Sequence, residues 1–171
     1  GTRTKAYLDG DEWVINGEKC WITNASYAYQ VVVTAVTGQD ERGKNIITAI
    51  IVPTDTPGVT IRSDYQKMGV RASNTCEIVL ENVRVPRENI LGDEKKGFGQ
   101  FLNTLDGGRI SIAALSVGIA QSAFEKALQY AKERVQFGQS ISKLQAIQFK
   151  LADMAMEIEL ARNMVQKAAW L

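Results

Sequence analysis

In the first half of the chain, apolar and polar positions follow the two-residue period of β-strands. Residues 12–15 and 19–23 flank Asn16-Gly17, a dipeptide typical of the positive φ of a two-residue turn, so they predict a β-hairpin. More β-branched runs follow, separated by turn chemistry such as Pro57-Gly58. These runs predict strands over residues 31–37, 46–52, 59–62, 76–80 and 83–85, with a polar loop at 38–45.

The second half changes to helical spacing. From Gly97, apolar residues recur every three or four positions, which predicts a long helix disturbed at Gly107-Gly108 and ending near Phe137-Gly138. Ser142 and Gln145 fit a capping box, so a second helix is predicted from there to Leu171, where no stop signal is seen. The predicted fold is therefore α+β, with an antiparallel sandwich or partial barrel in residues 1–92. Residues 93–171 would hold the first two long helices of a helical bundle.

Composition excludes several classes of function. The net charge is +1, so charge gives no reason to expect binding to nucleic acid or an anionic membrane. The chain has no histidine, which removes histidine-based triads and most zinc sites. Cys20 and Cys76 lack metal-ligand spacing and are expected to be free thiols, and no apolar run is long enough to span a bilayer.

Three segments could carry chemistry, and each has an ordinary structural interpretation. Trp21-Ile22-Thr23 reads as the end of a strand, because aromatic and β-branched residues are common in any strand. From the residue types alone this interpretation is favoured. The alternative is a platform for a flavin, with Trp21 against the ring system and the Thr23 hydroxyl donating to its polar edge.

The second segment joins the two predicted helices. Arg134 followed by Phe137-Gly138 is typical of a helix C-terminus, where a cation and a glycine are common. Alternatively, the guanidinium of Arg134 could bind phosphate oxygens, and the helix start at Gln145 could favour an anion.

The third segment is Asp106-Gly107-Gly108-Arg109. It reads as a surface ion pair between residues i and i+3, around two glycines that permit close packing. The alternative is a wall of a substrate pocket, with Asp106 and Arg109 facing the ligand.

Taken in order and spacing, these segments resemble the acyl-CoA dehydrogenase family. The resemblance is carried by Lys19-Cys20-Trp21-Ile22-Thr23-Asn24, by Leu105 to Arg109 and by Glu133 to Gly138. It covers nearly the whole chain but only the middle β-domain and the start of the C-terminal helical domain of the family. The chain is therefore expected to be a fragment of a longer enzyme.

The resemblance implies an FAD enzyme that desaturates a short- or branched-chain acyl-CoA in fatty-acid β-oxidation. Trp21, Ile22 and Thr23 would contact FAD in the same subunit. Arg134, Phe137 and Gln145 would reach the FAD of a neighbouring subunit in a homotetramer built as a dimer of dimers. Electron-transferring flavoprotein would accept the electrons.

The family also implies a substrate wall and a catalytic base. Asp106, Gly107, Gly108 and Arg109 would line the acyl-CoA pocket. Isovaleryl and long-chain members carry their catalytic glutamate within this helix, but the matching position here is Gly108, which holds no base. The base is thus expected downstream of Leu171, and the isolated chain is expected to be inactive.

Two other functions remain open. An acyl-CoA oxidase or a flavin monooxygenase relative could use the same scaffold, and the chain alone could be a non-catalytic module that self-associates. The expected location is the cytoplasm of a bacterium or the mitochondrial matrix of a eukaryote.

Overall fold

The structure is a computed structural model that describes residues 2–63 and 65–171. The backbone divides into two compact units, residues 1–102 and residues 103–171. Six strands and two 3-10 helices are described in the first unit. Their bounds are β1 (Lys5–Asp9), β2 (Glu12–Thr23), η1 (Ala25–Tyr27), β3 (Gln30–Gln39), β4 (Asn45–Pro53), β5 (Val59–Arg62), β6 (Thr75–Pro86) and η2 (Arg87–Asn89).

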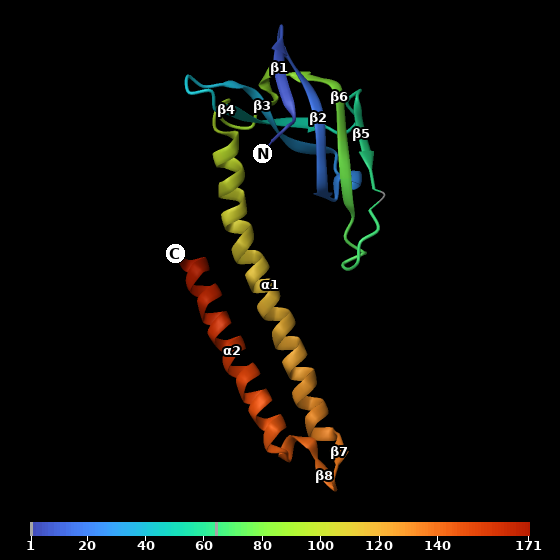
Figure 1. Cartoon of the computed structure of the whole chain (residues 1–171), viewed down its shortest axis with the longest axis vertical. Coiled ribbons are helices and arrows are strands. Elements are labelled where there is room, and N and C mark those ends of the chain that lie inside the picture. The colour runs from blue at the N-terminus through green and yellow to red at the C-terminus, as the bar shows by residue number, and fades with distance from the viewer. Residues whose placement is uncertain (1, 64) are drawn as a thin grey trace. The chain divides into compact units, whose positions relative to one another are not determined.

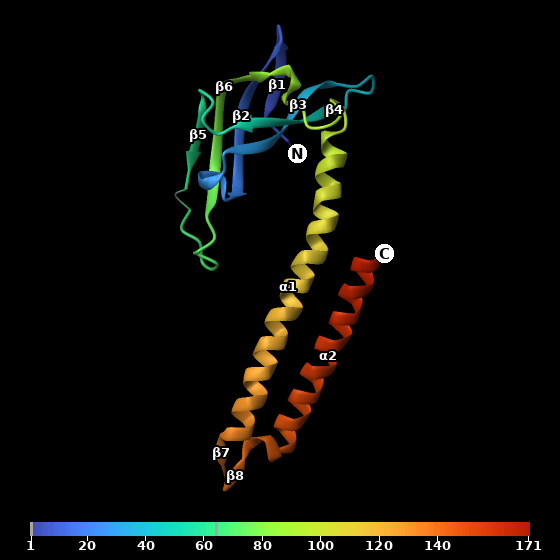
Figure 2. The ribbon, with the colours of Figure 1, turned by 180° about the vertical axis from the view of Figure 1, so that it is seen from behind.

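These strands form one sheet in the order β4-β3-β1-β2-β6-β5. Neighbours are antiparallel except β1 and β3, which run parallel where Lys5 lies opposite Val36. In Figures 1 and 2 the strands β3 and β4 run across the direction of β2 and β6, so the sheet is strongly curved. A single curved sheet matches the partial barrel of the predicted α+β fold, although its one parallel pair was not foreseen.

The concave sheet encloses the core of the first unit. Trp13 is 2% exposed, and its indole N–H donates to the main-chain oxygen of Arg87 at 3.3 Å. Burying a large apolar side chain completely stabilises a fold by roughly 1.5–3 kcal/mol. The core includes the buried residues Ala6, Ile15, Val33, Ala35, Ile50, Val52, Cys76, Ile78, Leu80, Val83 and Val85.

The predicted hairpin turn at Asn16-Gly17 is wrong. Both residues lie inside β2, and the turn falls earlier, at Gly10-Asp11, where Asp9 pairs with Glu12. The register between β2 and β6 shifts between Ile15 and Gly17, which marks a β-bulge. Gly17 has φ +144°, and a Cβ on it would lie 2.7 Å from the Cα of Thr4. Glycine is therefore required there by backbone conformation and close approach rather than by a turn.

Two strands predicted separately, at 76–80 and 83–85, are parts of the single strand β6. The interruption is at Asn82, which has φ +51° and, together with Glu81, lies opposite the single β2 residue Asn16. The structure thus keeps both segments on one strand and absorbs the irregularity as a local bulge.

The first unit includes the beginning of α1 (Gly97–Glu133). A Cβ on Gly97 would lie 2.5 Å from the main-chain nitrogen of Ala49, so the helix start passes directly over β4. The main-chain N–H of Leu91 donates to the oxygen of Ala49 at 2.9 Å and ties the preceding segment to the same strand. Helix α1 continues through Gly107 and Gly108 without a break, contrary to the predicted disturbance.

The second unit is a helical hairpin. After α1 come β7 (Val135–Gln136), β8 (Gln139–Ser140), η3 (Ile141–Lys143) and α2 (Gln145–Trp170). In both views of the ribbon, α2 returns alongside α1. Phe137 and Gly138 have φ +52° and +74° and form the two-residue turn between β7 and β8. They are therefore a hairpin turn rather than the predicted helix stop, and α1 ends at Glu133.

The predicted capping box is also wrong. The residue before α2 is Leu144, and no side chain caps the helix start. The hydroxyl of Ser142 instead lies 2.5 Å from that of Ser140, because residues 141–143 form the short helix η3. Gln145 is the first residue of α2, so it still lies in the first turn, as expected.

One face of α2 packs against α1 and the other is exposed. Ile158 is buried, and the guanidinium of Arg162 donates to Oε1 of Gln121 at 2.8 Å across the pair of helices. Large apolar residues outside this contact are more than half exposed: Phe149, Met156, Leu160, Met164 and Trp170. Helix α2 therefore carries apolar side chains both toward α1 and on its exposed side.

Candidate functional site

The site begins with a bulge in β2, the second irregularity in its pairing with β6. Lys19 pairs with Ile78 and Ile22 pairs with Cys76, so Cys20 and Trp21 together oppose the single residue Glu77. Trp21 takes φ +62°, a left-handed conformation that is rare for a bulky side chain. Such a conformation costs about 1–3 kcal/mol and is found most often where function requires it.

The bulge turns Trp21 outward. Cys76 and Ile78 of β6 are buried on the core side. Thr75, the first residue of that strand, therefore points to the opposite, outer face of the sheet. Thr23 lies directly opposite Thr75 and shares that outer face. Trp21 is 67% exposed, whereas Ile22 packs against the core. Of the three predicted flavin residues, Trp21 and Thr23 are therefore available to a ligand through their side chains, and Ile22 serves as an anchor.

Tyr65 was not foreseen from the sequence. Its ring stacks on the indole of Trp21, with 4.3 Å between ring centroids and 24° between planes. The pKa of Tyr65 is raised, chiefly by partial burial and then by its hydrogen bond with Cys20 and the nearby Glu77 carboxylate. A hydrogen bond with the Trp21 main chain acts in the opposite direction. No periodic pattern marks Tyr65, because it lies in an irregular segment and meets Trp21 only in the folded chain.

The end of β2 is fixed by Asn74. The main-chain N–H of Asn24 donates to the oxygen of Asn74 at 3.2 Å, and the hydroxyl of Ser26 donates to its side-chain oxygen at 3.0 Å. These bonds hold Asn24, which has φ +61°, immediately after Thr23. The hydroxyl of Thr23 makes no hydrogen bond with the described residues, so it is free to donate to a ligand.

The second group of predicted residues lies at the turn of the helical hairpin. Arg134 is exposed, and its guanidinium makes no ion pair with any carboxylate in the described part of the chain. Phe137 is 88% exposed at the tip of the β7–β8 turn, and Gln145 begins α2. The main-chain N–H of Ile141 donates to the oxygen of Arg134 at 2.9 Å and ties the β-turn back to the helix end. The structure thus brings these three residues to one end of the second unit.

The third group lies along α1. Arg109 donates from Nη1 to Oδ1 of Asp106 at 3.0 Å, which is the i, i+3 ion pair that the sequence predicts. Both side chains are about 70% exposed, at 73% and 68%. A Cβ on Gly107 or Gly108 would meet nothing within 4 Å, so within this chain neither glycine is required by packing. The open space beside these two glycines leaves room for a ligand or for another segment of polypeptide.

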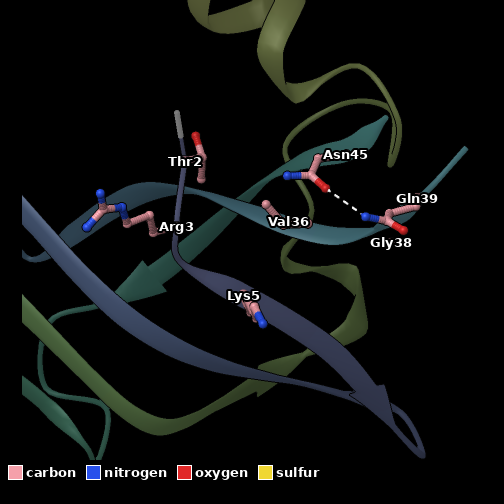
Figure 3. A pocket seen from close by; sticks show the side chains of 7 residues that line it. All are labelled: Thr2, Arg3, Lys5, Val36, Gly38, Gln39 and Asn45. Atoms are coloured by element: carbon pink, nitrogen blue, oxygen red, sulfur yellow. Dashed lines mark hydrogen bonds between the residues drawn. The ribbon is translucent and has the colours of Figure 1, made fainter. Parts of the chain in front are cut away.

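A separate open pocket of about 620 Å³ lies at the edge of the sheet, lined by seven residues. Figure 3 shows Arg3 and Lys5 on one side and the hydrogen bond from Gln39 to Asn45, 3.3 Å long, on the other. The remaining lining residues are Thr2, Val36 and Gly38. None of the predicted site residues lines this pocket.

Within residues 2–63 and 65–171, no three acidic or cysteine side chains gather closely enough to hold a metal ion. Neither long helix of the described chain contains an apolar stretch capable of crossing a bilayer. Cys20 and Cys76 are both free thiols, as predicted, the first exposed and the second buried.

The fold is a curved six-stranded β-domain in the first unit and a helical hairpin in the second. A family model described as "Acyl-CoA dehydrogenase, middle domain" matches residues 1–83, and one described as "Acyl-CoA dehydrogenase, C-terminal domain" matches residues 95–171. The chain belongs to the acyl-CoA dehydrogenase family.

Individual relatives agree. The chain is 75% identical over 171 residues to a probable acyl-CoA dehydrogenase, YngJ, of Bacillus subtilis, which covers all of this chain and 45% of that protein. It is 48% identical over 168 residues to the mitochondrial short-chain specific acyl-CoA dehydrogenase of Bos taurus, covering 98% of this chain and 40% of that protein. The chain therefore spans less than half the length of these relatives.

The fold comparison gives the same family. The structure superposes on butyryl-CoA dehydrogenase from Megasphaera elsdenii with a TM-score of 0.91 and 47% identity. The match covers 98% of this chain and 44% of the other.

Proposed function

We propose that the polypeptide containing this chain is an FAD-dependent acyl-CoA dehydrogenase that oxidises a short- or branched-chain acyl-CoA to the 2-enoyl-CoA. The observation that carries the proposal is the bulge in β2, which leaves Trp21 exposed two residues before the exposed Thr23, within a chain of this family. The domain boundary is proposed at residues 92 and 93, between the two family matches.

The residues of the first unit fit a flavin. An exposed indole offers a planar stacking surface, and the free hydroxyl of Thr23 offers a donor next to it. When bound, FAD would supply the acceptor for the hydrogen removed from the acyl chain. Trp21 would hold the ring system in place and shield it from water. Thr23 would donate a hydrogen bond to its polar edge, and Ile22 would keep both fixed to the core.

The residues at the helical hairpin fit the other end of the cofactor. Arg134 has an unpaired guanidinium, the group best suited to two phosphate oxygens. Phe137 and Gln145 lie at the same end of the unit, and the main-chain N–H groups at the start of α2 favour an anion. In this proposal the three residues bind the FAD of a neighbouring subunit, in a homotetramer built as a dimer of dimers.

Substrate binding is assigned to the segment from Asp106 to Arg109. The exposed ion pair would contact the acyl-CoA, and Gly107 and Gly108 would leave room for it. A carboxylate base is needed to remove the α-proton, and Gly108 cannot supply one. We assign the base to a glutamate outside these 171 residues, so the isolated chain should not turn over substrate.

The remaining assignments follow from the same function. Electrons would pass to electron-transferring flavoprotein, and the enzyme would act in β-oxidation. It would lie in the cytoplasm of a bacterium or in the mitochondrial matrix of a eukaryote.

The test uses the longest natural polypeptide that contains this chain, beside the 171-residue chain itself. The longer protein should be yellow and should reduce an artificial electron acceptor with butyryl- or isobutyryl-CoA, whereas the 171-residue chain should not. A colourless longer protein would contradict the proposal, and reduction of oxygen at a comparable rate would identify an oxidase or monooxygenase instead.

A second test separates substrate contact from a surface ion pair. Asp106→Ala and Arg109→Ala should raise the KM for acyl-CoA while leaving the flavin content unchanged. The matched control is Lys96→Ala, which breaks another exposed i, i+3 pair, 2.6 Å long, with Asp93. Equal kinetics in all three variants would reduce the Asp106–Arg109 pair to a structural contact worth at most a few tenths of a kcal/mol.

A further inference from the structure

The side chain of Trp21 is held by Tyr65, a residue that belongs to none of the sequence motifs. The backbone of Trp21 is in the left-handed region, and the bulge removes Trp21 from the regular pairing of β2 with β6. A bulky side chain at such a position has few neighbours to restrict its χ angles, and Trp21 is 67% exposed. The contact that restricts it is the ring of Tyr65, stacked at 4.3 Å.

Tyr65 contacts the bulge at both ends of its side chain. The ring covers one face of the Trp21 indole, while the hydroxyl lies close enough to Cys20, the other bulge residue, and to the Trp21 main chain for both to affect its pKa. Glu77, the residue opposite the bulge, lies close to the same hydroxyl, and Cys20 Sγ is 3.9 Å from its Oε1. The indole and main chain of Trp21 and the thiol of Cys20 therefore surround the side chain of Tyr65.

We propose that Tyr65 is the positioning residue for Trp21, fixing the indole by stacking on one face so that the opposite face is presented to the flavin. The proposal rests on the proposed function, because it names the flavin as the occupant of the open face. It assigns Tyr65 no contact with substrate or cofactor. Its role is to reduce the freedom of an exposed side chain before the ligand arrives, which lowers the entropy lost on binding.

The first part of the test uses the 171-residue chain without flavin. The chain has three tryptophans, Trp13, Trp21 and Trp170, so 5-fluorotryptophan labelling gives three 19F resonances that single Trp→Phe variants assign. Tyr65→Leu should abolish the ring-current shift of the Trp21 resonance, while Trp13 and Trp170 stay in place. Tyr65→Phe should retain most of the shift, because the stacking ring remains.

A matched control is Tyr29→Leu, which removes a tyrosine that is 94% exposed and lies six residues after Thr23. It should leave all three resonances unchanged. If Tyr65→Leu disturbs the fold, Trp13 in the core reports it, and the comparison of wild type with Tyr65→Phe and Tyr29→Leu still decides the matter. A Trp21 resonance that is identical in wild type and Tyr65→Leu would overturn the proposal.

The second part uses the flavin-loaded longer polypeptide. A stacked indole quenches flavin fluorescence, so Trp21→Leu should brighten the bound flavin and sets the reference. Tyr65→Leu should brighten the flavin as well. Loss of the aromatic pair should lower the population of Trp21 side chains stacked on the flavin about 2- to 10-fold, which corresponds to the energy of one such pair. Brightening in both variants supports the proposal.

The two failures are distinguishable. If Trp21→Leu brightens the flavin but Tyr65→Leu does not, the flavin site stands and the role of Tyr65 is overturned. If neither variant changes the flavin while Tyr65→Leu still shifts the 19F resonance, the flavin does not lie on Trp21, and both the proposed platform and the inference built on it fail.

Discussion

The side-chain amide of Asn16 makes two hydrogen bonds with Asn82. Its Nδ2 donates to Oδ1 of Asn82 at 3.1 Å, and its Oδ1 accepts from the main-chain N–H of Asn82 at 2.8 Å. Asn82, at φ +51°, belongs to a bulge of β6, in which Glu81 and Asn82 together lie opposite the single β2 residue Asn16. The pair therefore fastens the β6 bulge to the neighbouring strand.

Asn16→Ala should lower the free energy of unfolding by about 1 kcal/mol, because a net hydrogen bond contributes about 0.5–1.5 kcal/mol and this pair is exposed. Urea denaturation of the chain measures it. Asn45→Ala is the control, since it removes one exposed side-chain bond, accepted from Gln39 at 3.3 Å, and leaves the Asn16–Asn82 pair intact. An effect of Asn16→Ala no larger than that of Asn45→Ala would show that the β6 bulge needs no fastening.

Gly97→Ala should destabilise the first unit by about 1–3 kcal/mol, because the new Cβ would lie 2.5 Å from the Ala49 nitrogen and the backbone would have to move. Gly99→Ala, two residues later, meets nothing within 4 Å and should instead stabilise the helix by up to about 1 kcal/mol. Thermal unfolding of both variants gives the comparison. Stabilisation by both substitutions would mean that α1 does not pass so close to β4.

Lys19 gives a pH-dependent prediction. Partial burial lowers the pKa of Lys19 below its usual 10.5, while its ammonium donates to the main-chain oxygen of Thr34 at 2.6 Å. The folded state thus binds this proton less tightly than the unfolded state, so the unfolding free energy should rise with pH from the lowered pKa up to 10.5. Lys19→Met should remove that rise.

The measurement is urea denaturation between pH 8 and 10.5, taken as the difference between wild type and variant so that other titrating groups cancel. Lys5→Met, on the neighbouring strand β1 and exposed, is the control and should leave the slope unchanged. Parallel pH profiles for wild type and Lys19→Met would contradict the burial of this ammonium.

Arg134→Ala in the longer polypeptide should weaken FAD binding by roughly 10- to 100-fold, because a hydrogen bond to a charged group contributes about 1.5–3 kcal/mol. Flavin content after gel filtration measures the loss, and thermal unfolding of the flavin-free protein should be nearly unchanged. Lys132→Ala removes another exposed cation from the last turn of α1 and should retain the flavin. Equal retention by both variants would reduce Arg134 to a cation that favours the helix end.

The isolated chain should self-associate at micromolar concentration through the exposed face of α2. Met156, Leu160 and Met164 are 56%, 60% and 66% exposed on this helix, and apolar patches of this kind are uncommon on soluble monomers. Sedimentation should show species heavier than 18.8 kDa. Leu160→Lys should dissociate them, whereas Gln166→Lys, which adds the same charge at an exposed position on another side of α2, should not. A stable monomer of wild type would show that this face needs no partner.

The sequence by itself determined the elements and the family of this protein. Period-two runs located most strands, helical spacing located α1 and α2, and three short motifs identified the acyl-CoA dehydrogenase family. Local patterns succeed here because the periodicity of buried positions follows directly from backbone geometry. The ion pair of Asp106 with Arg109 was foreseen for the same reason, since i, i+3 neighbours on a helix always lie together.

Only the tertiary structure decided where irregular backbone is used and what it brings together. Asn16-Gly17 and Phe137-Gly138 both signal positive φ, yet the first lies within β2 opposite a bulge of β6 and the second forms a hairpin turn. A local sequence cannot separate these outcomes, because the choice depends on partners such as Thr4 and Asn82. The stacking of Tyr65 on Trp21 was invisible for a related reason. The two residues are far apart in the chain, and they meet only because β2, β5 and β6 lie side by side in one sheet.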